Sequence, residues 1–426
     1  MRLRDLTVSA RYVFPVEGPP MAGGLLHIEH GRIKAVEPAG TRSPDLDLGN
    51  VAILPGFVNA HTHLELAPIG EPADPLADPV VEDEIAWLER VIAQRRGRNS
   101  PDLARQASEN VRKAVEAGTT LLADTTTAGL SWPAIASAPV RGVVFAELIG
   151  LRAERAAQTV ADAEVWLSTI KPEDQVAANA RPGLSPHAPY STAGWLYRHA
   201  AGSGLPLSTH LAEMPEELGL LSGRSGGLRG FLERLGAWDP DWEPIGDRPA
   251  DYIRKGGLRR ADWLVAHGNY FEPEDFWQFR PEASPDGRRV AIAYCPRTHA
   301  RFGHKPHPAR ALMEQGAVVC LGTDSLASAP SLSILEEARF LKRRHPEFPG
   351  PLLLAMATLF GAWALRAETV TGSLRPGKSA DLAIIALPDR DDEDPHALIL
   401  ESDRPVVGTV FEGRLHHRAG DLAPID

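Results

Sequence analysis

Two histidines spaced two residues apart, His61 and His63, end an apolar stretch of the chain that runs over residues 51–61. Residues i and i+2 of a β-strand point to the same side, so the two imidazoles would face a common site. Imidazole is a preferred ligand of zinc and similar divalent metals. A surface or hydrogen-bonded pair of histidines has the same spacing, so the pair alone does not establish a metal site.

The same arrangement recurs at four later points, where a short apolar stretch ends in His or Asp. These residues are His187 after GLSP, His210 after LPLST, His267 after WLVA and Asp324 after VVCLGT. Packing gives no reason for apolar stretches to end repeatedly in such residues. In an α/β barrel the carboxyl ends of all strands converge on one rim, where active sites lie. The set therefore predicts a metal site at that rim.

The elements that would carry these residues alternate along the chain. Residues 51–370 contain eight short apolar strands, most of them separated by helical stretches, which predicts a (β/α)8 barrel of the TIM type. Residues 1–50 and 371–426 instead alternate apolar and polar residues between Gly and Pro clusters. We expect them to form one small β-sandwich domain. Residues 222–262 are longer than a usual barrel loop and predict a lid, an edge of the pocket or a structural insertion.

Charge and composition narrow the class of partner. The chain has 45 Lys and Arg against 56 Asp and Glu, a net charge of −11, and no basic run, which disfavours nucleic acid and anionic membranes. We expect a small-molecule substrate, and a homodimer is compatible with the sequence. Two cysteines without a motif, no apolar leader and no stretch of membrane-spanning length predict a cytoplasmic protein.

Several motifs resemble the amidohydrolase superfamily, in the expected order and over almost the whole chain: PGFVNAHTHLE, SPHAPYST, STHLAE, VAHG, LGTDS and GSLRPGKSADLAII. They are most similar to the branch of cyclic deaminases and chlorohydrolases that act on aminated purines, pyrimidines and triazines. The resemblance implies one divalent metal, Zn first, with Fe or Mn as alternatives. Its ligands here would be His61, His63, His210 and Asp324. It also implies that His267 contacts the bound water or another metal, and that His187 faces the substrate ring.

The chemistry of the residues agrees with that implication. A divalent ion acidifies a water molecule that it binds, and an ionised Asp324 beside that water could accept its proton. Glu213 lies three residues after His210 and could protonate a ring nitrogen and then the departing amine. The alternative for Glu213 is a carboxylate that stabilises a helix start. We favour the catalytic role because the HLAE string places Glu213 next to a ligand.

The seventh strand departs from the branch. Many of its deaminases carry a CP-x-SN string, whereas this chain has CPRTH from Cys295 to His299. We expect Arg297, together with His299, Arg301 and His304, to reach an anionic or polar substrate group. A hydrogen-bonded loop that joins strands seven and eight is the alternative. Glu147 is expected to bind substrate or join the rim hydrogen bonds, unless it forms a structural salt bridge.

These features predict a hydrolytic deaminase of an aminated heterocycle that releases ammonia. The HLAE-x-x-EE string and the seventh-strand substitution resemble aminodeoxyfutalosine deaminases, which favours a 5′-modified adenosine such as aminodeoxyfutalosine. Methylthioadenosine, S-adenosylhomocysteine and guanine remain alternatives. A chlorohydrolase or another amidine or ring hydrolase would not need the acid, so Glu213 argues against it. A non-catalytic metal-binding barrel is disfavoured because all four expected ligands and the acid are present.

Overall fold

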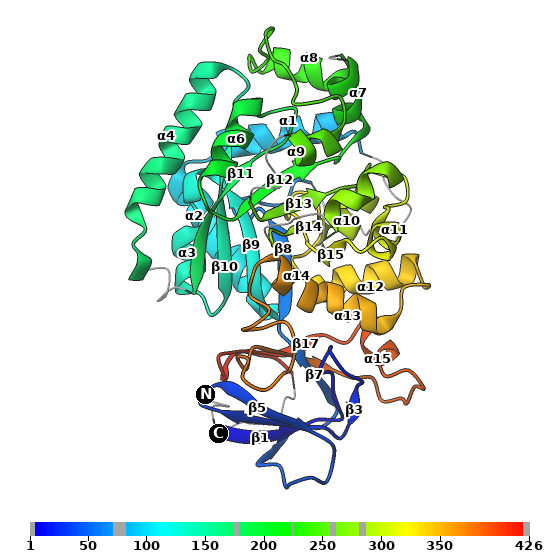
Figure 1. Cartoon of the computed structure of the whole chain (residues 1–426). Helices are drawn as coiled ribbons and strands as arrows, with labels where there is room; N and C mark the ends of the chain where they lie inside the picture. The colour runs from blue at the N-terminus through cyan, green and yellow to red at the C-terminus, as the bar shows by residue number, and fades with distance from the viewer. Residues whose placement is uncertain are drawn as a thin grey trace.

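The computed structural model describes residues 5–70, 82–173, 179–223, 225–255, 261–280 and 287–420. Its largest unit is a sheet of eight parallel strands in the order in which they follow along the chain (Figure 1). The strands are β8 (Phe57–Thr62), β9 (Thr119–Thr126), β10 (Arg141–Leu148), β11 (Ala180–Pro186), β12 (Leu207–Leu211), β13 (Trp263–His267), β14 (Val290–Tyr294) and β15 (Val318–Leu321).

The first and last strands of this sheet meet and close the barrel. The amide of Asp324 donates to the carbonyl oxygen of His61 at 3.0 Å, and a bridge joins Thr62 to Asp324. Nearly all residues of these strands are buried, as expected for strands that helices enclose. The structure thus has the predicted (β/α)8 barrel, and it brings the first and last metal-ligand candidates together.

Helices surround the barrel and follow most of its strands. They are α1 (Glu84–Arg96), α2 (Ser100–Glu116), α3 (Trp132–Ser137), α4 (Ala153–Thr169), α6 (Gly194–Gly202), α7 (Pro215–Gly223), α8 (Gly227–Arg234), α9 (Pro249–Lys255), α10 (Pro296–Arg301), α11 (Ala309–Glu314), α12 (Ile334–Arg344), α13 (Gly350–Ala357), α14 (Leu359–Ala364) and α15 (Ala397–Leu400), with 3-10 turns η1 (Thr127–Gly129) and η3 (Pro273–Phe279). Among the described helices, none combines the length and apolar character needed to cross a membrane.

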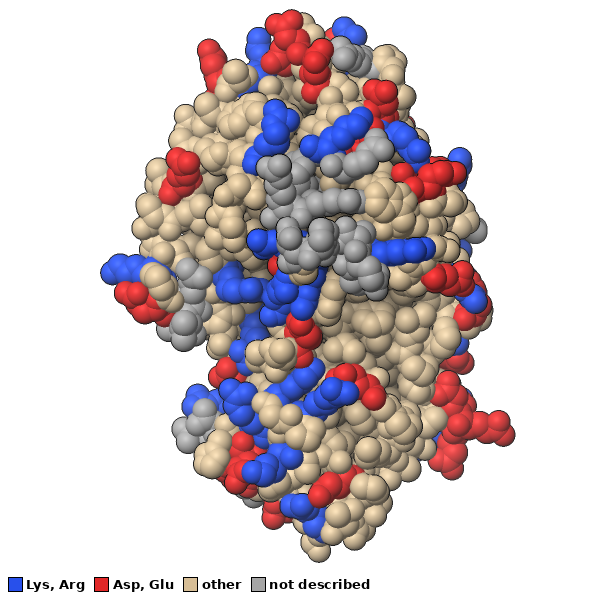
Figure 2. Space-filling view, viewed as in Figure 1, with Lys and Arg blue, Asp and Glu red and all other residues tan. Residues whose placement is uncertain are grey.

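The two ends of the chain form a small β-domain beside the barrel (Figure 1). One sheet contains β1 (Asp5–Ser9), β4 (Leu25–Glu29), β5 (Arg32–Glu37) and β6 (Leu46–Asp47), and the other contains β2 (Tyr12–Val13), β3 (Met21–Ala22), β7 (Val51–Pro55), β16 (Leu382–Ala386), β17 (Val406–Phe411) and β18 (Arg414–Arg418). Apolar residues of both sheets, including Val8, Ile28, Ile53 and Ile384, form its core. On the face drawn in Figure 2, acidic and basic side chains are interspersed.

The stretch 51–61, which we expected to be a single barrel strand, is divided at Gly56. Its first half, β7, pairs with β16 and β2 in the terminal domain, and its second half, β8, enters the barrel. The chain therefore changes sheet at Gly56 and not at the expected boundary, residue 51. A Cβ at Gly56 would lie 2.0 Å from Oγ1 of Thr120, so this crossing requires a residue without a side chain.

Candidate functional site

The histidine pair lies at the carboxyl end of the first barrel strand. His61 is the fifth residue of β8, and His63 follows the strand directly. The Nε2 atoms of His61 and His63 lie 3.9 Å and 3.8 Å from Oδ1 of Asp324, which follows β15. Nε2 of His63 also lies 3.1 Å from Nε2 of His210, on β12. The barrel thus brings all four expected ligands to one point.

The donor atoms of this cluster fit a bound divalent cation. One potential ligand from each of His61, His63 and Asp324, and one from each of His61, His210 and His267, lie within 4.8 Å of one another. Donors about 2.1 Å from a tetrahedral ion are separated by roughly 3.4 Å. The Nε2 atoms of His61 and His267 are buried and make no hydrogen bond, although an oxygen of Glu213 lies 3.2 Å from that of His267. Buried polar atoms seldom remain unsatisfied, so these two nitrogens indicate a ligand between them.

Neighbouring groups orient the ligands toward this point. Nδ1 of His210 lies 3.0 Å from the carbonyl oxygen of His187 and donates to it, which leaves Nε2 with its lone pair directed to the cluster. The hydroxyl of Ser328 donates to Oδ2 of Asp324 at 2.6 Å, so Oδ1 is the oxygen that faces the histidines. Asp324 has a φ of 56°. This left-handed conformation is uncommon for a residue other than glycine and is frequent at functional sites.

Burial sets the protonation of the cluster. It lowers the pKa of His61 and His210 well below the usual value, and it lowers the pKa of His267 to about 3. The imidazoles are therefore neutral near pH 7, which is the form that binds a metal. Burial also raises the pKa of Asp324, against the opposing effect of His63. A cation among these groups would stabilise the carboxylate form of Asp324.

Glu213 faces His267 at the edge of the cluster. Its Oε1 atom lies 3.2 Å from Nε2 of His267, and both side chains are almost fully buried. Burial, together with the nearby carboxylates of Glu84 and Asp324, raises the pKa of Glu213 well above the usual value. A raised pKa favours the protonated carboxyl, which is the form that can act as a general acid.

The conformation of the segment after β12 favours this role over the alternative of a helix-start carboxylate. Ala212 has a φ of 54°, and its amide and that of Glu213 both donate to the carboxylate of Glu217 at 3.0 Å. The side-chain amide Nδ2 of Asn269 donates to the carbonyl oxygen of Glu213 at 2.8 Å. Glu217, rather than Glu213, thus binds the free amides before α7, and the Glu213 side chain is left to face the cavity.

Glu147, on β10, belongs to a network at the rim that the sequence only partly indicated. Its Oε1 atom lies 3.9 Å from both His63 Nδ1 and His187 Nε2, and its Oε2 atom lies 3.4 Å from Arg95 of α1. Arg95 also pairs with Glu65 at 2.8 Å. Arg95 could not be identified from sequence because α1 has no motif. Glu65 could have been identified from sequence, because it directly follows Leu64 in the HTHLE string that contains His63.

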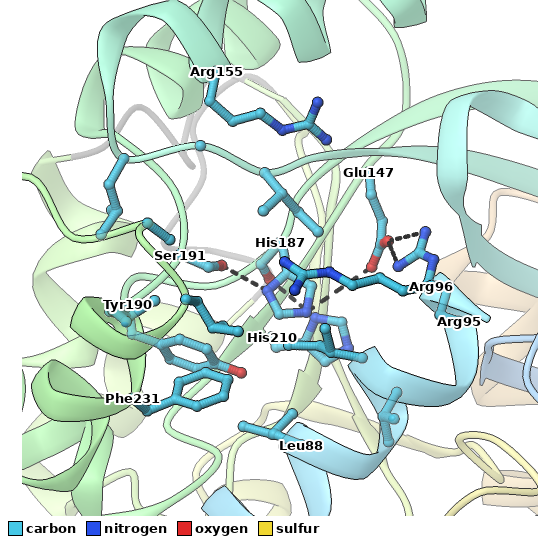
Figure 3. Close-up of a pocket in the computed structure, with 18 of the residues that line it drawn as sticks. Leu88, Arg95, Arg96, Glu147, Arg155, His187, Tyr190, Ser191, His210 and Phe231 are labelled. Atoms are coloured by element: carbon cyan, nitrogen blue, oxygen red, sulfur yellow. Dashed lines mark hydrogen bonds and ion pairs between the residues drawn. The ribbon is translucent and has the colours of Figure 1, made fainter.

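A cavity of about 600 Å³ opens from the ligand cluster. Its lining includes His63, His187, His210, Glu213, His267 and Asp324 from the strand ends, and Tyr190, Phe231, Leu88 and the arginines of α1, several of which are labelled in Figure 3. Within the stretch 222–262, the structure describes all residues except 224 and 256–260. Of the described residues, those of α8 and those that directly follow it form part of the cavity wall. That stretch therefore forms an edge of the pocket.

Arg297 does not reach this cavity, so its expected contact with substrate is corrected. Its side-chain Nε and its backbone amide donate to the two carboxylate oxygens of Glu337 on α12, at 2.7 and 2.9 Å. Its Nη1 and Nη2 atoms donate to the hydroxyl and the carbonyl oxygen of Ser331. Arg301 pairs with Glu82 at 2.8 Å, and His304 lies 3.4 Å from Glu84. The loop after β14 is thus fixed by its own partners, which matches the structural alternative.

Replacing Arg297 by alanine should therefore lower stability and leave substrate binding almost unchanged. Loss of one partner leaves the buried Glu337 carboxylate uncompensated, which costs about 3–5 kcal/mol in free energy of unfolding. Urea unfolding and kcat/KM of the folded fraction would test this. Arg310→Ala, which breaks an exposed pair on α11, is the matched control and should cost about 0.5 kcal/mol or less. A large rise in KM with unchanged stability would show instead that Arg297 contacts the substrate.

Comparison with known proteins supports the fold and the family. The model of the Amidohydrolase family matches residues 52–416. The 5-methylthioadenosine/S-adenosylhomocysteine deaminase of Moorella thermoacetica is 29% identical over 411 residues, which cover 91% of this chain and 85% of that protein. The aminodeoxyfutalosine deaminase of Deinococcus radiodurans is 28% identical over 324 residues, 72% of each chain. Their names agree with the deaminase resemblance found in the sequence.

A solved structure extends the likeness to the whole fold. The crystal structure of an adenosine deaminase from Xanthomonas campestris with bound zinc superposes with a TM-score of 0.75 at 20% identity and covers 99% of this chain and 95% of that one. The match of the family model spans the barrel and the part of the terminal domain that the C-terminal end of the chain supplies. The chain therefore belongs to the amidohydrolase family, a metal-dependent family, and is a hydrolase that acts on carbon–nitrogen bonds.

Proposed function

We propose that this protein is a hydrolytic deaminase of a 6-aminopurine nucleoside that carries a modified 5′ position, with aminodeoxyfutalosine as the first candidate. The observation that carries the proposal is the placement of the buried Glu213 carboxyl 3.2 Å from His267, at the inner end of a cavity that also contains the ligand cluster. An acid there can protonate a ring nitrogen. The names of the two relatives, both of them deaminases of adenosine derivatives, support the same reaction.

His61, His63, His210 and Asp324 would hold one divalent metal, for which zinc is our first choice. When bound, the metal lowers the pKa of a water molecule and so makes a nucleophile available at neutral pH. Asp324 can accept a proton from that water through Oδ1, which faces the histidines. His267, whose Nε2 atom lies 3.2 Å from Oε1 of Glu213, can donate to or accept from the attacking oxygen.

The proton balance of deamination assigns the remaining steps to Glu213. The water oxygen forms a bond to the ring carbon that bears the amino group, while Glu213 gives its proton to the adjacent ring nitrogen. Asp324 then passes the proton that it took from the water to the amino group, and Glu213 regains its proton from the hydroxyl on the tetrahedral carbon. The carbon–nitrogen bond breaks, and ammonia leaves a 6-oxopurine. His187 would contact the ring; its position in the cavity lining, with Nδ1 2.7 Å from the hydroxyl of Ser191, supports this role.

Ammonia release tests this proposal. We expect kcat/KM to be highest for 5′-modified adenosines, with aminodeoxyfutalosine, methylthioadenosine and S-adenosylhomocysteine compared against adenosine, guanine and a chlorotriazine. The cavity volume of about 600 Å³ exceeds what a purine ring alone needs, so guanine should be a poor substrate. If guanine is the best substrate, the nucleoside proposal is wrong; if the chlorotriazine releases chloride faster than any adenosine releases ammonia, the chain is a chlorohydrolase.

A further inference from the structure

The barrel contains a buried carboxylate that the proposed mechanism does not use. Asp124 lies near the carboxyl end of β9, which runs beside β8 in the sheet (Figure 1). Its side chain is fully buried, and no basic side chain in the described part of the chain forms an ion pair with it. A carboxylate is costly to bury without a partner, so its hydrogen bonds should explain why it is there.

Asp124 lies beside an irregularity in the pairing of these two strands. The register of β8 against β9 shifts between Asn59 and Thr62, where two residues of β8 lie opposite one residue of β9. Such a bulge interrupts the backbone ladder and changes the direction of the strand. His61 is one of the two bulged residues, and His63 follows directly after the strand. Contacts from side chains therefore gain importance for where these histidines point.

The carboxylate of Asp124 supplies such contacts. Its Oδ1 atom accepts hydrogen bonds from the hydroxyl of Thr62 at 2.9 Å and from the backbone amide of Leu64 at 2.8 Å. These donors belong to the residues on either side of His63, so one buried oxygen holds both neighbours of a proposed ligand. Asn110 of α2 fixes the same turn from the other side, because its Nδ2 atom donates to the carbonyl oxygen of Leu64 at 2.9 Å.

We propose that Asp124 is a positioning residue for the metal: its carboxylate fixes the turn at residues 62–64, so that His63 faces the other ligands before a cation binds. Among the described residues, Asp124 is not part of the clusters whose donor atoms could hold the ion, so it acts through His63. Groups behind a metal ligand commonly set the orientation of that ligand. The inference rests on the proposed ligand set and adds to it the residue that keeps one ligand in place.

The equilibrium transfer of zinc from the purified protein to a chromophoric chelator tests the inference, because it reports metal affinity without a substrate. Asp124→Leu keeps a side chain of similar size and removes the acceptor, so zinc should bind on the order of 10- to 100-fold more weakly, the usual scale for a lost group behind a ligand. Asp124→Asn retains an oxygen for both donors and should bind zinc within about fivefold of the wild type.

Two threonines give a second comparison that leaves every carboxylate in place. Thr62→Val removes the hydroxyl that lies 2.9 Å from both Oδ1 of Asp124 and the carbonyl oxygen of Ala123, and should weaken zinc binding about three- to tenfold. Combined with Asp124→Leu it should add little, because both changes act on the same turn. Thr409→Val is the control: it removes an equally buried hydroxyl of the terminal domain, which donates to the carbonyl oxygen of Val115. It should lower the melting temperature and leave zinc affinity unchanged.

Three results would overturn the inference. If Asp124→Leu melts at a lower temperature and binds zinc as tightly as the wild type, Asp124 has a structural role only. If Asp124→Asn loses as much affinity as Asp124→Leu, the charge matters and the hydrogen bonds do not. If Asp124→Leu does not fold, Thr62→Val decides, and an unchanged zinc affinity in that variant would contradict the inference.

The ligand set on which the inference rests is tested separately by His63→Ala. Unchanged zinc affinity in this variant would remove His63 from the ligands, whatever the result for Asp124. None of these measurements involves a nucleoside, so they are also independent of the ammonia assay that tests the deaminase function.

Discussion

Replacing both His61 and His63 by alanine is expected to remove the bound divalent ion and to reduce turnover to the uncatalysed background. The wild type should contain about one ion per chain, because three histidines and one aspartate form one site. The double variant retains His210, His267 and Asp324, but these come from separate strands and leave half of the first coordination sphere empty. Elemental analysis of both purified proteins, with an ammonia assay alongside, gives the result.

The control for this experiment is His199→Ala, which removes an exposed histidine of α6 and should leave metal content and turnover at the wild-type level. Circular dichroism would show that the double variant is folded, since its buried histidines are replaced by smaller residues at the rim and not within the apolar core. Equal metal content in the wild type and the folded double variant would contradict the ligand assignment.

Replacing Glu213 by glutamine should keep the metal and lower kcat by on the order of 10²-fold or more, the usual scale of general acid–base catalysis. Glutamine has almost the same shape, and the backbone contacts of this segment are made by Glu217 and Asn269, so the fold should be unchanged. What is lost is the proton that the carboxyl can give to the ring nitrogen. The measurement is kcat, with metal content determined on the same sample.

Glu216→Gln is the matched control, because Glu216 lies three residues further on, in α7, and does not line the cavity. It should turn over substrate at close to the wild-type rate. A near-normal kcat for Glu213→Gln with metal retained would show that Glu213 has a structural role only. A loss of metal from Glu213→Gln would instead indicate that this carboxyl is itself a ligand.

The barrel and the inner end of the site could be predicted because both depend on local patterns. Short apolar stretches give the strands, and parallel strands bring their carboxyl ends to one rim, so His61, His210 and Asp324 had to lie close together. The role expected of Glu213 followed from its distance of three residues from a ligand. These inferences need only the order of elements and the direction of each strand.

The outer part of the site depends on contacts between residues that are distant in sequence. Arg297 was expected to contact the substrate because it directly follows the seventh strand, and residues that follow barrel strands lie at the rim of the active site. Its partner Glu337 lies 40 residues later on α12, and nothing in the sequence signals that pairing. Arg96 and Arg155 have no motif either. They reach the cavity because α1 and α4 both border it. This could be predicted only from the positions of the two helices in three dimensions.

Strand ends and helices supply different parts of the cavity, so its substrate selectivity can change separately from its chemistry. The residues proposed to do chemistry follow barrel strands, whereas α1, α4 and α8 supply the outer wall. Substitutions in these helices can therefore alter the shape and charge offered to a substituent without moving a ligand or the acid. Such a scaffold can diverge toward new nucleosides by successive single changes, each of which retains a working catalytic centre, and it offers α1 and α8 as the segments to randomise in directed evolution.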